Sequence, residues 1–406
     1  MSRHAPAVTS PPRGVFTAGG SHLPILDDVH DDALHIACFT DFDEPGLEAA
    51  WLALHERVGA MPFFSPAWAV SWWHTLRRDT SLTRDSLRLF VVRDVLDDLV
   101  AIAPMMLTER RLAGMSIART LHFIGADPNI TEVRGMLVAK EDEARTVTAL
   151  YAEIERRREH DRLIWSGLGD AGAASLASAA PGARHALTVS VLIVALPDSW
   201  DTFKSALPRN TREALRKCYN SLGRESLTPS LRVHDTLETI RPTLDRFFAL
   251  HASRAAVEDG VVHRDCFDSA EARDFLCMFV DRIAPSGIVR MFELEVDGSV
   301  VAMRLAFLYG GGIYLYYAGY DPAWGKYSVM TTLVAEALKH AVSVGLPFAN
   351  LSTGVDRSKM RWRPDETRLE SLLVISSSPR ARLAIRFEAL TQRTRLLRER
   401  FARGRK

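Results

Sequence analysis

Alternating apolar and polar positions between Ile288 and Gly319 predict three consecutive β-strands. The runs VRMFELEV, VVAMRLAFLY and IYLYYAG are separated by Asp297-Gly298 and by the glycines at 310–312. Such turn residues supply the positive φ that tight turns between twisted strands require. We therefore expect an antiparallel meander, with Tyr314 and Tyr316 on one face of its third strand and Tyr317 on the other, because side chains alternate along a strand.

A helical pattern follows this meander directly. Apolar residues recur at helical spacing on one face, Ser328 is available as the N-cap, and Gly345 marks the end of the helix. A further strand is predicted at Phe348 to Leu351. The apolar face consists of Met330, Leu333, Val334, Ala337, Leu338 and Ala341.

The same order of elements occurs earlier in the chain. The runs LRLFVV, LVAIAPMML and LHFIG precede a helical pattern near Ala144 to Glu159 and a strand at Leu163 to Leu168. Two units of this kind favour two α/β domains over one large sheet. The predicted parts are a flexible tail (1–30), an N-terminal domain (31–196), a C-terminal domain (197–378) and a basic C-terminal helix (379–406).

The two units differ in the connection between meander and helix. The second has the short AWGKYS turn, whereas the first has NITEVRGMLVAK, which is long enough to add a strand. A strand that leads straight into a helix N-terminus exposes backbone N–H groups that suit an anion. We therefore expect the second unit to carry a ligand site and the first to be a degenerate partner that helps to close the groove.

Composition narrows the classes of function. The 406 residues are 47% hydrophobic and 25% charged, and 51 basic against 50 acidic residues leave a net charge of +1. This balance gives no overall attraction to nucleic acid or to an anionic membrane. The longest apolar run, 187–196, is half of the ~20 residues that a membrane helix needs. We expect a soluble, cytoplasmic protein.

The cysteines indicate a reducing compartment. They are scattered and lack a CxxC motif or a neighbouring histidine pair, so the sequence predicts neither a disulfide framework nor a metal site. The N-terminal 20 residues are rich in proline, glycine and serine and lack the apolar core of a signal peptide. The cysteines are Cys38, Cys218, Cys266 and Cys277.

Several segments together resemble the cellulose-biosynthesis (CelD/BcsL-like) acetyltransferases of the GNAT superfamily. They are FFSPAW at 63–68, RNTREALRK, FFALHASR at 247–254, YYAGYDPAWGKYS and FANLSTGVDRSKMRW at 348–362. The resemblance implies tandem GNAT-like (acyl-CoA N-acyltransferase) domains with mixed sheets flanked by helices, and acetyl-CoA or another acyl-CoA as co-substrate. Members of the family usually carry a Tyr-Lys pair after the last strand, whereas this chain has Ser358-Lys359.

The resemblance places the acyl donor at the AWGKYS turn. Gly325 lets the backbone approach a pyrophosphate and Lys326 adds charge, although the turn lacks the usual glycine- and arginine-rich GNAT pattern. Without the resemblance, this segment is an ordinary strand-to-helix turn. The predicted donor site consists of Tyr317, Trp324, Gly325, Lys326, Tyr327 and Ser328, with Tyr327 as the acid that protonates the leaving thiolate.

Two clusters are candidates for the acceptor end. His251 and Arg254 lie one turn apart on a predicted helix, where His251 is a candidate base and Arg254 an anion clamp. Asp356 follows the last strand as a second candidate base. The alternatives are a buried structural histidine and an aspartate that favours a helix N-terminus. The predicted acceptor residues are Arg254, Tyr320, Asp321, Lys359 and Trp362, although Asp-Pro is also a common turn opener.

Two basic segments have less specific interpretations. Arg209, Arg212 and Arg216 share one face of a helix, which is more often a solvated face than a phosphate site. The C-terminal basic helix is a candidate for peripheral contact with a membrane or a synthase, and packing on its own domain is the alternative. No nucleic-acid partner is expected.

The sequence thus predicts acyl transfer from acyl-CoA to an amine or hydroxyl of a small molecule or glycan precursor, in polysaccharide or cell-envelope metabolism. Two alternatives stay open. One is an aminoacyl-tRNA-dependent peptidyltransferase of the FemABX type, against which the chain shows no long helical-arm insertion. The other is a non-catalytic GNAT scaffold that supports exopolysaccharide synthesis.

Overall fold

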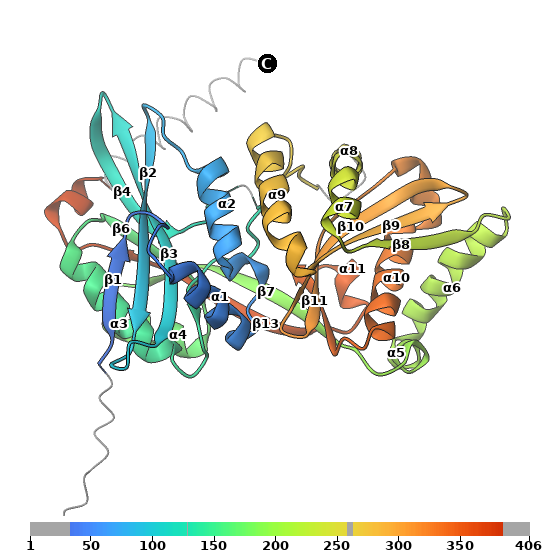
Figure 1. The fold of residues 1–406 in the computed structure, drawn as a ribbon, viewed down its shortest axis with the longest axis horizontal. Helices are drawn as coiled ribbons and strands as arrows, with labels where there is room; N and C mark the ends of the chain where they lie inside the picture. The colour runs from blue at the N-terminus through green and yellow to red at the C-terminus, as the bar shows by residue number, and fades with distance from the viewer. Residues whose placement is uncertain (1–32, 128, 258–262, 385–406) are drawn as a thin grey trace, which may run out of the picture.

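The computed structural model describes residues 33–127, 129–257 and 263–384. Two α/β halves lie side by side along its long axis (Figure 1). The N-terminal tail and most of the C-terminal basic helix predicted from the sequence lie outside the described residues. The first half contains β1 (His35–Phe39), α1 (Leu47–Val58), η1 (Pro62–Phe64), α2 (Pro66–Leu76), β2 (Thr83–Arg93), β3 (Leu99–Leu112), β4 (Met115–Phe123), β5 (Leu137–Val138), α3 (Glu143–Arg157), β6 (Arg162–Leu168), α4 (Asp170–Ala179) and β7 (Arg184–Ala195).

The second half contains the predicted meander, helix and strand from β9 onward. Asp297 and Gly298 both have positive φ in the first hairpin, as predicted from the sequence. Its elements are α5 (Trp200–Ala206), α6 (Arg209–Gly223), β8 (Pro229–His234), α7 (Leu237–Ile240), η2 (Arg241–Thr243), α8 (Leu244–Ala255), α9 (Ala270–Ile283), η3 (Ala284–Ser286), β9 (Val289–Val296), β10 (Ser299–Tyr309), β11 (Gly312–Tyr320), η4 (Pro322–Tyr327), α10 (Val329–Ser343), β12 (Phe348–Thr353), α11 (Arg357–Met360) and β13 (Asp365–Ile375).

An exchange of strands joins the halves. The sheet order is β1-β2-β3-β4-β6-β13-β7-β12-β11-β10-β9-β8, with β5 paired to β3. Strand β13, late in the chain, pairs with β6 of the first half, while β7 pairs with β12 of the second half. The two expected sheets therefore form one continuous 13-stranded sheet, a connection that the sequence analysis did not predict.

Helices cover both faces of this sheet. Helices α1, α2, α8 and α9 pack on one face of both halves in a single apolar core. On the opposite face, α3 and α4 cover the first half, and α5, α6 and α10 cover the second. Trp68 on α2 lies 4.7 Å from Phe279 on α9 between ring centroids, so aromatic packing continues across the boundary between the halves. No helix in the described ranges is long and apolar enough to span a membrane.

Candidate active site

The central parallel pair of the second half diverges. Strands β11 and β12 pair only at Ile313/Ala349 and Tyr314/Asn350, although β11 continues to Tyr320. Just beyond the last pair, Tyr316 and Tyr317 both lie opposite Leu305 of β10. This is a β-bulge, which bends a strand and is common beside active sites. The divergence and the bulge together place the middle of β11 at a break in the sheet.

The bulge changes the direction of the β11 tyrosines. Alternation was expected to separate Tyr316 from Tyr317, but their rings lie 4.6 Å apart and both contact the first half. That part of the sequence prediction was wrong, because an extra residue in one strand interrupts the alternation. The Tyr316 hydroxyl donates to the Ile130 carbonyl at 2.5 Å, and the Tyr317 hydroxyl donates to the Asn129 carbonyl at 2.6 Å.

The corresponding break in the first half is filled by main chain. Strands β4 and β6 pair only from Thr120/Arg162 to His122/Ile164. Beyond that point, a Cβ atom at Gly167 would lie 2.2 Å from the Arg134 carbonyl oxygen, and one at Gly135 would lie 3.0 Å from the Ser166 carbonyl oxygen. Residues 134–135 therefore lie directly against the diverging part of β6.

The AWGKYS turn forms the 3-10 helix η4 and leads into α10. Gly325, Lys326 and Ser328 are exposed, and a Cβ at Gly325 would contact only the Tyr320 ring, at 3.7 Å. Ser328 has φ 57°, and its side chain makes no cap hydrogen bond. The first N–H groups of α10 have no hydrogen-bond partners within the helix. They lie next to this exposed turn.

The aromatic and charged side chains of this turn face α6. Tyr327 is buried and its hydroxyl donates to Glu225, just after the end of α6. The Lys326 amine lies 3.7 Å from a carboxylate oxygen of Glu225 and 4.6 Å from the centroid of the Tyr327 ring. Trp324 packs its ring 5.5 Å from that of Tyr327, while Asp321 accepts from the Ala323 amide at 3.0 Å.

The segment after β12 is held by Asp356. Its carboxylate accepts hydrogen bonds from the amides of Ser358 at 2.7 Å and Lys359 at 3.1 Å, which makes it the N-cap of α11. Burial acts to raise the pKa of Asp356, but the Ser358 hydrogen bonds and the charge of Lys359 hold it below its ordinary value. The Lys359 ammonium donates to the Thr353 carbonyl, and burial lowers its pKa.

Trp362 occupies a different environment from Asp356 and Lys359. It is 2% exposed and stacks on Phe203 of α5 with ring centroids 6.5 Å apart. Its ring therefore contributes to the core between α5 and α10. Tyr320, at the end of β11, packs partly against the same core.

His251 is paired with Asp265. The Nδ1 atom lies 2.9 Å from the Asp265 carboxylate, and Nε2 lies 3.7 Å from the thiol of Cys266. An Nδ1–H donated to Asp265 leaves Nε2 as the basic nitrogen. Burial lowers the pKa of His251, and Asp265 opposes that shift. The imidazole centroid lies 5.4 Å from that of Tyr317, which brings two predicted site residues together.

Helix α8 reaches β11 through a glycine. A Cβ at Gly319 would lie 2.2 Å from the His251 amide nitrogen, so only glycine permits this approach. Arg254, one turn after His251, donates to the Ala318 carbonyl at 3.1 Å. Burial lowers the pKa of Arg254, and Tyr320 and Asp356 oppose the shift. Arg254 is therefore within electrostatic range of Tyr320, a predicted acceptor residue, and of Asp356, a candidate base.

Two charged residues that sequence reasoning missed complete the centre. Glu132 of the first half accepts from the Tyr314 hydroxyl at 2.7 Å and from the Ser352 hydroxyl at 2.5 Å. Burial raises its pKa. Arg304 on β10 donates to the Tyr316 carbonyl at 2.8 Å, and burial lowers its pKa to about 10. The only sequence signal was the unusual length of the loop that contains Glu132.

A cavity of about 460 Å³ begins beside Glu132 and lies between the halves. It is lined by parts of β7 and β13, by residues 127, 129 and 131–134 of the first half, and by residues 353–355. Hydroxyl and charged side chains are common in the lining. The polar residues that line it are Asp127, Asn129, Thr131, Glu132, Arg134, Ser166, Thr188, Ser190, Thr353 and Ser371.

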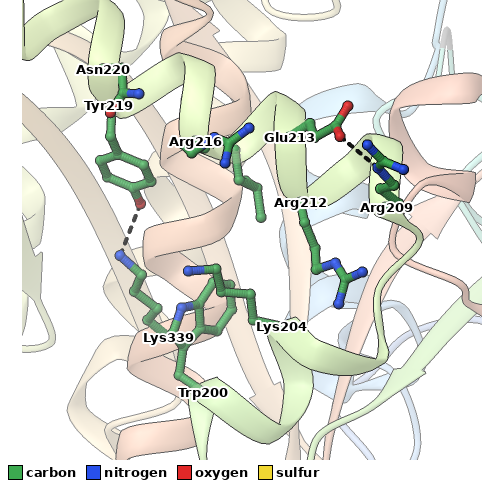
Figure 2. Close-up of a pocket in the computed structure, with 10 residues that line it drawn as sticks. Trp200, Lys204, Arg209, Arg212, Glu213, Arg216, Tyr219, Asn220 and Lys339 are labelled. Carbon is green, nitrogen blue, oxygen red and sulfur yellow. Dashed lines mark hydrogen bonds and ion pairs between the residues drawn. The ribbon is translucent and has the colours of Figure 1, made fainter.

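A second pocket, of about 700 Å³, lies between α5, α6 and α10 (Figure 2). The predicted basic face of α6 lines it, opposite the buried face of Thr211, Leu215, Cys218 and Leu222. Arg209 pairs with Glu213 at 2.8 Å, and Lys339 pairs with Glu336 at 2.6 Å. Its other basic side chains are Lys204, Arg212 and Arg216.

No cluster of histidine, cysteine, aspartate or glutamate among the described residues has the arrangement of a metal site. The four cysteines are free thiols. The groups near the break in β11 and β12 include carboxylates, an imidazole, cationic side chains and backbone amides.

Parts of this chain are similar to known proteins. Residues 209–360 match the model of the acetyltransferase (GNAT) domain, whereas no curated protein matches the chain. Among solved structures, FemX is similar over 81% of this chain and 96% of its own, with 11% identity and a TM-score of 0.55. A tandem GNAT protein from the clavulanic acid biosynthesis pathway is similar over 85% and 99%, with 12% identity and a TM-score of 0.45.

The domain match covers α6, the meander with its bulge, η4, α10, β12 and α11, which are the elements that build the centre. The match supports the GNAT superfamily but not the cellulose-biosynthesis family within it. The chain therefore contains an acetyltransferase (GNAT) domain at residues 209–360, within a tandem GNAT-like fold.

Proposed function

We propose that the chain transfers an acetyl or other acyl group from acyl-CoA to an amine or hydroxyl at the break between β11 and β12. One observation carries the proposal: the diverging strands and the β11 bulge adjoin an exposed turn that leads into α10. The donor's pyrophosphate would lie at this turn, near the first amides of α10. Gly325 leaves room for it and Lys326 is exposed beside it.

The proposed reaction is direct attack within a ternary complex. The acceptor nitrogen or oxygen forms a bond to the thioester carbonyl carbon, the carbon–sulfur bond then breaks, and the CoA thiolate takes up a proton. Backbone N–H groups beside the bulge would stabilise the developing oxyanion, an effect worth roughly 3 kcal/mol per donor. No covalent enzyme intermediate is needed.

His251 and Asp356 remain the proposed bases, with different support. The Asp265 pair leaves Nε2 of His251 to accept a proton, but that nitrogen lies beside the buried Cys266 thiol. Asp356 is half-exposed and close to Arg254 and Lys359, but its lowered pKa weakens it as a base. Tyr327 stays the proposed acid for the thiolate, although its hydroxyl is engaged by Glu225.

We further propose that the acceptor comes from polysaccharide or cell-envelope metabolism and that the reaction takes place in the cytoplasm. Its support is the sequence resemblance to the cellulose-biosynthesis acetyltransferases. The peptidyltransferase alternative is favoured by one specific observation, the basic pocket on α6, which suits a phosphate backbone. Both alternatives place their chemistry at the same break in the sheet.

Binding measurements with the purified chain test these proposals. Acetyl-CoA should bind in calorimetry and should yield free CoA only when an acceptor is present. A chain that transfers an amino acid from aminoacyl-tRNA and ignores acetyl-CoA would establish the alternative. A chain that binds neither donor would be the non-catalytic scaffold.

A further inference from the structure

The cavity between the halves contains two charged groups of opposite sign. Glu132 lines the cavity, and its carboxylate bridges Tyr314 of β11 and Ser352 of β12. Arg134, two residues later, lines the same cavity. Because both belong to one loop of the first half, that half supplies charge to the break in the sheet of the second.

The Arg134 guanidinium makes no hydrogen bond or ion pair within the described part of the chain, although the nearby Asp127 carboxylate acts on it electrostatically. That carboxylate already accepts hydrogen bonds from three other residues. It accepts from the Trp72 indole N–H at 2.8 Å, the Ile130 amide at 2.6 Å and the Thr131 hydroxyl at 2.6 Å. Arginine presents several donors in a planar fork that matches a carboxylate or phosphate. An anion in the cavity would satisfy this side chain.

Glu132 offers the complementary interaction. Each of its oxygens accepts one hydroxyl hydrogen bond, and a carboxylate has about four acceptor positions. Burying the Glu132 carboxylate costs free energy unless a cation or additional hydrogen-bond donors compensate for the lost water. A ligand ammonium would provide both at the point where β11 and β12 separate.

We propose that the cavity binds the acceptor and that this acceptor carries both an amine and an anionic group. Glu132 would hold the amine at the break between β11 and β12, and Arg134 would bind the anion. The inference rests on the acyl-transfer function proposed above, and it names the substrate class as amino-carboxylates or similarly sized zwitterions. Glu132 is a positioning residue here, and the proton passes to the base already proposed.

Matched pairs of small acceptors test this assignment. Glycine, β-alanine and L-lysine would be compared with methylamine, ethylamine and cadaverine, with acetyl-CoA as donor and CoA release as the readout. Each zwitterion should have a KM at least tenfold below that of its matched amine. The difference should disappear in Arg134→Gln, because only the anion contact is lost.

Glu132→Gln should raise the KM of zwitterions and amines alike at least tenfold and leave acetyl-CoA affinity within twofold. Glu366→Gln is the matched control: Glu366 also accepts from a serine hydroxyl, that of Ser190 at 2.7 Å, but it does not line the cavity. Glu366→Gln should change neither the acceptor KM nor the acetyl-CoA affinity by more than twofold. Because the Glu132 hydrogen bonds join the two halves, the thermal unfolding midpoint of each variant would be measured to confirm folding. Arg134→Gln tests the assignment without removing those hydrogen bonds.

The pH profile separates binding from a merely structural role. Burial raises the pKa of Glu132 against the hydrogen bonds from Ser352 and Tyr314 and the charges of Lys359 and Arg304. Amine binding should therefore be complete above that pKa and weaken as the pH falls through it. Glu132→Gln should remove this dependence. An equal KM within each pair, or a zwitterion preference that survives Arg134→Gln, would overturn the inference. A failure to bind acetyl-CoA would instead refute the proposed function itself.

Discussion

The two halves have the same order of elements but differ at the same point of the sheet. In the first half, residues 134–135 of its own chain lie against the diverging part of β6. In the second half, the corresponding divergence is reached by the Glu132 carboxylate, and a cavity begins there. Main chain therefore occupies, in the first half, the position at which the second half has a cavity.

One loop accounts for both outcomes. Residues 129–135 fill the first break at their C-terminal end and contact Tyr314, Tyr316 and Tyr317 of the second half through their N-terminal part. The long NITEVRGMLVAK connection, which distinguishes the first repeat from the second in sequence, is thus the segment that couples them in space.

The largest effect is expected where the first break is filled. Gly167 has φ 77°, and a Cβ there would lie 2.2 Å from the Arg134 carbonyl oxygen. Gly167→Ala should lower the free energy of unfolding by about 3 to 5 kcal/mol, because backbone must move and the left-handed conformation is strained. Urea denaturation measures this. Gly182→Ala, with open space around it, should cost under about 1 kcal/mol, and similar losses in both would contradict the packing described.

A histidine in the first half should make the fold acid-sensitive. Burial lowers the pKa of His122 to about 4, with Asp85 opposing the shift. Since the folded pKa lies below the unfolded value near 6.5, the contribution of the neutral His122 imidazole to the free energy of unfolding is fully present above about pH 6.5. It is lost as the pH falls toward 4. The shift corresponds to roughly 3 kcal/mol. Urea titrations at pH 7 and 4.5 should show a smaller pH effect in His122→Gln than in the parent chain.

Substitutions at the candidate bases of the second half should lower turnover rather than stability. If Asp356 is the base, Asp356→Asn should lower kcat by ~10², about 2.7 kcal/mol, while acetyl-CoA affinity stays within twofold. If His251 is the base, His251→Gln should show that pattern instead. Steady-state kinetics and calorimetry together distinguish them. Equal losses of affinity and turnover in both variants would mean that these residues hold the fold.

The meanders, α3, α10 and the turn before α10 could be predicted because their signals are local: alternation, helical spacing and turn residues. The centre could be predicted only in part. His251 and Arg254 were found from helical spacing, but Asp265, Glu132 and Arg304 join them through contacts between segments distant in sequence. The exchange of β7 and β13 has no local signal, since either strand would pair equally well by its own pattern.

A smaller effect is expected at the donor turn. Gly325→Glu should weaken acetyl-CoA binding at least tenfold, about 1.4 kcal/mol, because it places a carboxylate and added bulk against the pyrophosphate. Lys140→Glu introduces the same side chain at the exposed connection before α3 of the first half. It should change affinity less than twofold if only the second half binds the donor. Unchanged affinity in a folded Gly325→Glu variant would remove the donor site from this turn.

The smallest effect is expected at the proposed boundary near Leu196-Pro197. Chain connectivity suggests two separable domains there, since β7 ends at Ala195 and α5 begins at Trp200. The sheet argues otherwise: β7 pairs with both β12 and β13, and β13 pairs with β6. A protease should therefore cut slowly around residue 197, and the two fragments should stay together in size-exclusion chromatography because each keeps a strand inside the other's sheet. A dominant early cut with separating fragments would show that the halves are independent domains, and Glu132 would then have no fixed place beside Tyr314.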